Sequence, residues 1–115
     1  MTITELKDIA KSYGLIVKDD EHDVWIEVFF NNIPEFWDNE NYNYPNKLID
    51  CRNSYFNVYT KLRKTKSGKF VINIQKHYHI NNYTPRRLHN LIKRIQKQIK
   101  VKLIAKRLEG IKQDF

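Results

Sequence analysis

Hydrophobic residues begin the chain at a helical spacing. Between residues 3 and 13, apolar side chains recur every three or four positions. Thr2 precedes Glu5 by three positions, which is the spacing of a capping box, and Gly14 stands where a left-handed residue commonly ends a helix. The pattern therefore predicts a helix from about residue 3 to residue 13.

The central part of the chain changes to the alternation of strands. Residues 15–18 and 24–30 flank a polar run and predict a first hairpin, and residues 47–51 predict a short strand. Residues 54–64 and 70–79 alternate on either side of a turn that contains a Ser-Gly pair. This second hairpin is the clearest strand signal in the sequence.

The segment 31–46 has neither spacing. It contains two prolines, six asparagines and the aromatic residues Phe36, Trp37, Tyr42 and Tyr44. Prolines and asparagines are typical of irregular loops, and four exposed aromatic side chains together would be costly. We therefore expect an irregular loop that packs against the rest of the protein.

The last third returns to a helical spacing. Thr84-Pro85 is typical of a cap followed by the first helical residue. One face then carries Leu88, Leu91, Ile92, Ile95 and Ile99. Beyond Lys100 the apolar residues move to the opposite face, and they are Val101, Ile104, Ala105, Leu108 and Ile111. This shift indicates a bend or break near Lys100, a strand at 99–103, or a partner for the distal half, and we favour a bend or break.

These elements predict an α+β fold. It would have an N-terminal helix, an antiparallel sheet of three to five strands, and a long basic C-terminal helix packed on one sheet face. The length of 115 residues predicts a single domain, 1–115. One cysteine excludes an internal disulfide framework, and apolar runs of at most three residues predict no membrane span and no signal peptide. We therefore expect a cytoplasmic location.

Charge is distributed unevenly along the chain. Residues 1–50 have a net charge of −7, residues 51–83 of +7 and residues 84–115 of +8. Between residues 51 and 100 there are thirteen basic residues and no acidic one. A lysine-rich solvated surface would also contain glutamate, so the absence of acids favours binding of a polyanion.

The basic residues are accompanied by tyrosines, a combination typical of nucleic-acid surfaces. Lysine and arginine neutralise phosphates, and tyrosine stacks on unpaired bases. The candidate nucleic-acid-binding residues are Lys61, Arg63, Lys64, Lys66, Lys69, Lys76, Arg86, Arg87, Lys93, Arg94, Lys97, Lys100, Tyr55 and Tyr59.

Catalytic chemistry has a weaker basis in the sequence. His77 and His79 fall on one face of a predicted strand, where they could ligate a metal or act as acid and base. No third ligand stands at a recognisable spacing, and no phosphate-binding loop or hydrolase motif is present. We therefore expect no metal, no cofactor and no enzymatic activity, and a His-based metal-dependent enzyme is the least favoured function.

Two functions remain in competition. The first is a non-enzymatic nucleic-acid-binding accessory protein. The second is a small inhibitor from a phage or mobile element that binds a nucleic-acid-processing protein of the host, such as a CRISPR-type nuclease. Asn, Lys, Ile and Tyr make up 48 residues and Ala only two, which indicates an AT-rich coding sequence, as in a low-GC bacterium or its phages and plasmids, and does not distinguish the two functions.

The distal apolar positions define a candidate partner-binding site. Val101, Ile104, Leu108 and Ile111 would bind a second copy of the chain or another protein if the helix is continuous.

Overall fold

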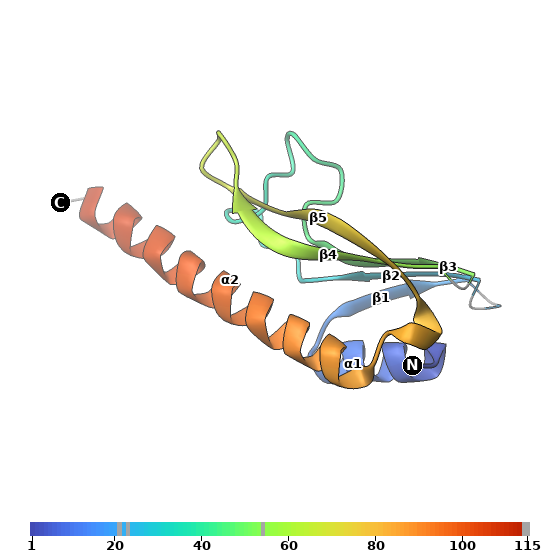
Figure 1. Cartoon of the computed structure of the whole chain (residues 1–115). Coiled ribbons are helices and arrows are strands. Elements are labelled where there is room, and N and C mark those ends of the chain that lie inside the picture. The colour runs from blue at the N-terminus through green and yellow to red at the C-terminus, as the bar shows by residue number, and fades with distance from the viewer. Residues whose placement is uncertain (21, 23, 54, 114–115) are drawn as a thin grey trace.

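The computed structural model describes residues 1–20, 22, 24–53 and 55–113, with side chains as far as residue 110. The chain forms a helix, five strands, a short 3-10 helix and a long helix (Figure 1). Their bounds are α1 Ile3–Ser12, β1 Ile16–Asp19, β2 Trp25–Phe29, β3 Lys47–Arg52, β4 Tyr55–Lys64, β5 Phe70–His79, η1 Ile80–Asn82 and α2 Pro85–Gln113. The predicted α+β fold is confirmed.

The five strands form one antiparallel sheet in the order β1-β2-β3-β4-β5. Each strand therefore pairs with its neighbour in sequence, which is the simplest antiparallel arrangement. The predicted hairpins 15–30 and 54–79 and the predicted strand 47–51 all take part in it. Glu21, Asp23 and Ser54, which belong to these predictions, lie outside the described residues.

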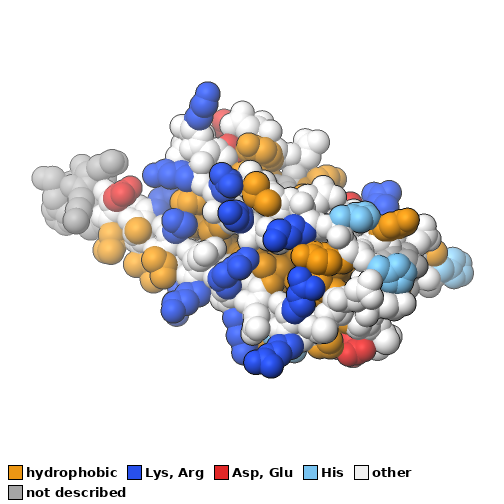
Figure 2. Space-filling view, viewed as in Figure 1, with side chains coloured by type: hydrophobic (Ala, Val, Ile, Leu, Met, Phe, Trp, Pro, Cys, Tyr) orange, Lys and Arg blue, Asp and Glu red, His pale blue; other side chains and the backbone are white. Residues whose placement is uncertain are grey.

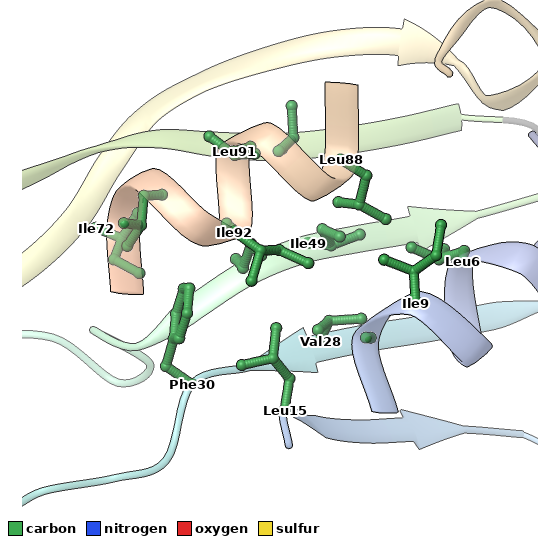
Figure 3. Close-up of a cluster of buried hydrophobic side chains, with 14 of the residues drawn as sticks. Leu6, Ile9, Leu15, Val28, Phe30, Ile49, Ile72, Leu88, Leu91 and Ile92 are labelled. Atoms are coloured by element: carbon green, nitrogen blue, oxygen red, sulfur yellow. The ribbon is translucent and has the colours of Figure 1, made fainter. Parts of the chain in front are cut away.

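Both helices lie on the same face of the sheet (Figure 1). The capping box predicted at the start of α1 is present, since Glu5 N–H donates to Thr2 Oγ1 and Thr2 N–H donates to Glu5 Oε1. Apolar side chains from α1, α2 and the inner face of the strands meet in one core, including Leu6, Val28, Ile49 and Ile92 (Figure 3). The core therefore fixes the position of the proximal half of α2 on the sheet.

The loop 31–46 packs through only two of its four aromatic residues. Phe36 and Trp37 are fully buried, whereas Tyr42 and Tyr44 are 42% and 58% exposed, so the expectation of an irregular loop that packs against the protein is confirmed through the first pair. The Phe36 ring stacks on Phe70 with centroids 4.6 Å apart. The loop also forms backbone hydrogen bonds with the first residues of β5, which covers this edge of the sheet.

Asp38 links this loop to the turn between β4 and β5. Its side chain is buried, and its carboxylate accepts hydrogen bonds from Ser67 Oγ and Asn41 Nδ2. Hydrogen bonds from Thr65, Asn41 and Ser67 lower the pKa of Asp38 to about 2. The carboxylate thus stays ionised and holds the turn against the loop.

The long helix α2 is continuous, so the break expected near Lys100 and the alternative strand at 99–103 are both wrong. The core-facing stripe continues past Ile99 to Leu103, and both side chains line an open pocket of about 320 Å³ together with Trp37. Further on, Arg107 forms an ion pair of 2.7 Å with Glu35. The loop 31–46 therefore supports the distal half of α2, which the helical spacing alone does not reveal.

Candidate nucleic-acid interface

A groove with a volume of about 630 Å³ lies between α2 and the β4–β5 hairpin. Four basic residues line it: Lys61 and Lys76 from the hairpin, and Arg87 and Arg94 from α2. None of the described residues that line it is acidic. We call these four residues the basic groove residues.

Arg87 is held in the groove by two tyrosines. Its guanidinium carbon lies 4.7 Å from the ring centroid of Tyr78 and 4.6 Å from that of Tyr83. Its Nη2 also donates to the Tyr78 hydroxyl at 3.1 Å. A guanidinium placed over aromatic rings is held in one orientation, and its planar fork of N–H donors matches two oxygens of a carboxylate or phosphate.

Arg94 spans the groove from the helix to the sheet. Its Nη2 donates to the backbone carbonyl of Thr60 at 2.7 Å. Opposite Thr60 stands Ile74, which has a φ of +62°, a strained value for a β-branched residue. The Thr60 hydroxyl donates to the Ile74 carbonyl at 3.0 Å, so this strained position lies directly beside the arginine contact.

The basic groove residues have no acidic partner among the described residues, because no described carboxylate lies within 4.0 Å of their side-chain nitrogen atoms. Figure 2 shows Lys and Arg side chains gathered along α2 and over the neighbouring hairpin, with few acidic side chains between them. Unneutralised charge beside low-dielectric walls gives a strong positive potential. The groove is thus suited to bind an anionic chain.

The other predicted basic residues lie outside the groove. Arg63, Lys64, Lys66 and Lys69 lie towards the far end of the β4–β5 hairpin, where the Lys69 ammonium donates to the Pro34 carbonyl at 3.3 Å. Arg86, Lys93, Lys97 and Lys100 are exposed on α2 but are not part of the groove lining. These residues of the hairpin and of α2 extend the positive surface beyond the basic groove residues.

The predicted tyrosines, Tyr55 and Tyr59, do not lie beside the basic groove residues. Tyr55 alternates with the buried Phe56 and lies on the sheet face opposite the helices, whereas Tyr59 is half-buried against the core, and neither of them lines the groove. The tyrosines of the groove are instead Tyr78 and Tyr83. The strand alternation could have identified Tyr78, because it pairs with the core residue Phe56.

His77 contacts side chains of the neighbouring strand, and Cys51 belongs to the core. The His77 ring is hydrogen-bonded to the Asn57 side chain and stacks on Tyr55. Cys51 is buried, and burial raises the pKa of its thiol. Within the described part of the chain, no three His, Cys, Asp or Glu residues are grouped so that they could hold a metal ion.

The predicted partner-binding residues form an exposed apolar stripe on α2. Val101, Ile104 and Leu108 are 59%, 50% and 53% exposed, while the side chain of Ile111 lies outside the described residues. The helix is continuous here, as the predicted binding of a partner to this stripe requires. Monomeric proteins seldom expose such a stripe.

We therefore expect the protein to form dimers that Ile104→Lys with Leu108→Lys converts to monomers, because two charges within an apolar contact are costly. Light scattering coupled to gel filtration measures the mass. The matched control is Ile16→Lys with Val24→Lys, which adds the same charge at two other exposed apolar residues and leaves the dimer intact. A wild-type protein that remains monomeric at high concentration would contradict self-association.

Comparison of the chain with protein-family models, curated proteins and solved structures gave no significant match. None of the described helices is long and apolar enough to cross a membrane.

Proposed function

We propose that this protein is a non-enzymatic nucleic-acid-binding accessory protein that holds a phosphate backbone in the groove between α2 and the β4–β5 hairpin. The observation that supports it is that the basic groove residues converge from two elements and that no described residue of the lining is acidic. Phosphate contacts supply affinity largely independent of sequence. The groove thus favours general binding over recognition of one sequence.

The arrangement of the arginines supports phosphate as the ligand. Arg87 lies on Tyr78 and Tyr83, and Arg94 is bonded to the Thr60 carbonyl, so both guanidinium groups are oriented before a ligand binds. Pre-oriented arginines lose less side-chain freedom on binding and match the two oxygens of a phosphate.

Binding to labelled nucleic acid at different salt concentrations tests this function. We expect binding at about 50 mM salt and a slope of log affinity against log salt of roughly −3 to −4, because each of the four basic groove residues would displace counterions from a phosphate. Polarisation at micromolar protein measures both quantities. Absence of binding to every single-stranded and double-stranded probe would refute the proposal.

A second candidate function rests on the exposed stripe Val101, Ile104 and Leu108. We propose as the alternative that this stripe binds a nucleic-acid-processing protein, as an inhibitor from a phage or mobile element would. Affinity capture from the host, with and without nuclease treatment, separates the two candidates. Recovery of one protein irrespective of nuclease favours the inhibitor, whereas loss of all partners after nuclease favours the accessory protein.

A further inference from the structure

Flat side chains form a row on the sheet face opposite the helices. The strand register places Trp25 beside Arg52, Arg52 beside Tyr55, and Tyr55 beside His79, across β2, β3, β4 and β5. Side chains directly opposite one another on paired strands point to the same face. We call these four residues, together with His77, the open-face cluster.

The open-face cluster is accessible and partly stacked. Tyr55 is 59% exposed, and Arg52, His77 and His79 are also exposed, while Trp25 is half-buried. The Tyr55 ring stacks on His77 with centroids 5.0 Å apart and an angle of 30° between the planes. Because more than half of Tyr55 remains accessible, a further flat ring can lie against it.

The charges beside this cluster, on the same face of the sheet, are already paired. Lys47 forms ion pairs with Glu27 and, at 4.0 Å, with Asp50, and Arg52 Nε lies 3.4 Å from Asp50. Glu27 and Asp50 keep only 10% and 18% of their side chains exposed. The cluster thus presents aromatic and planar groups with little unneutralised charge, unlike the groove.

Planar groups without excess charge favour a ligand that stacks. Nucleobases stack on Tyr, Trp and His rings and on Arg guanidinium planes, whatever their sequence. The groove is close along the chain, since Lys76 lines it and the next residue, His77, belongs to the open-face cluster. A flexible single strand can bend around β5, whereas a duplex keeps its bases paired inside the helix.

We propose that the open-face cluster binds an unpaired base of single-stranded nucleic acid, with Tyr55 as its main stacking residue. This inference rests on the proposed function, because the groove would hold the phosphates of the same strand. It assigns the protein a preference for single strands.

The test compares a short oligothymidylate, an abasic oligomer of equal length and a duplex of that length, all by polarisation. The wild-type protein should bind the oligothymidylate about tenfold more tightly than the abasic oligomer, because only the former has bases to stack. Tyr55→Ala should remove this difference and leave the duplex affinity and the salt slope unchanged. Tyr55→Phe keeps the ring and should bind as the wild type does.

Tyr44→Ala is the matched control, because Tyr44 is another tyrosine with 58% exposure and lies outside the open-face cluster. It should leave all three affinities unchanged. Equal binding of the oligothymidylate and the abasic oligomer by the wild-type protein, or a Tyr55→Ala protein that still distinguishes them, would overturn the inference and leave the groove proposal standing. A wild-type protein that binds none of the three probes would overturn both.

Discussion

Replacing Arg87 and Arg94 together by Ala should weaken nucleic-acid binding by about 3–6 kcal/mol, or roughly a hundred-fold to ten-thousand-fold, because two charged hydrogen bonds of about 1.5–3 kcal/mol each are lost. Among the described residues that line the groove, these two are the only arginines. Their loss should also flatten the salt slope by about 1.5, since two phosphate contacts disappear. Polarisation titrations over a range of salt concentrations measure both effects.

The control for this pair is Arg86→Ala with Lys93→Ala. It removes the same charge from exposed positions of α2 outside the groove lining. We expect a loss of less than about 1 kcal/mol, since exposed charges act through a screened field. Equal losses in the two double variants would show that net charge, and not the groove, controls binding. Melting temperatures of both variants exclude unfolding as the cause.

Replacing Trp37 by Ala should lower the free energy of unfolding by about 3–5 kcal/mol, the usual cost of removing a buried Trp. Trp37 is fully buried, and its Nε1–H donates to the Asn31 carbonyl at 2.9 Å. Its ring also lies edge-on to Phe36 with centroids 4.9 Å apart. Urea unfolding followed by circular dichroism measures the loss.

Two further variants keep this prediction testable if Trp37→Ala does not fold. Trp37→Phe removes the hydrogen bond and part of the ring, and it should cost about 1–2 kcal/mol. Tyr42→Ala changes an aromatic residue of the same loop that is 42% exposed, and it should cost less than about 1 kcal/mol. A Trp37→Ala protein as stable as Tyr42→Ala would show that the loop contributes little to the core.

The candidate site could be predicted from the sequence only in part. The basic half of the chain identifies Arg87 and Arg94 as candidates, but it does not distinguish them from Lys93 and Lys97. That distinction depends on how α2 is rotated against β4, which the burial of Leu88, Leu91, Ile92 and Ile95 decides. The tyrosines were harder to place, because a residue type says nothing about the sheet face that a helix covers.

The sequence by itself determined the elements whose signals are local. The capping box of α1, the alternation of the β4–β5 hairpin and the start of α2 at Pro85 depend on neighbours a few residues apart. Sequential antiparallel pairing then follows from the short connections between β1 and β2, between β3 and β4, and between β4 and β5, whereas β2 and β3 are joined by the long loop 31–46. Periodicity and turn chemistry are therefore sufficient to predict the α+β fold.

Only the tertiary structure decided the course of the distal part of α2 and the division of the site into two faces. The distal part of the helix lies against the loop 31–46, because Leu103 lines a pocket together with Trp37 and Arg107 pairs with Glu35, a residue 72 positions away. The groove and the open-face cluster separate because the sheet has two faces and both helices pack on one of them. Contacts between residues far apart in the sequence leave no periodic signal, so packing alone determines them.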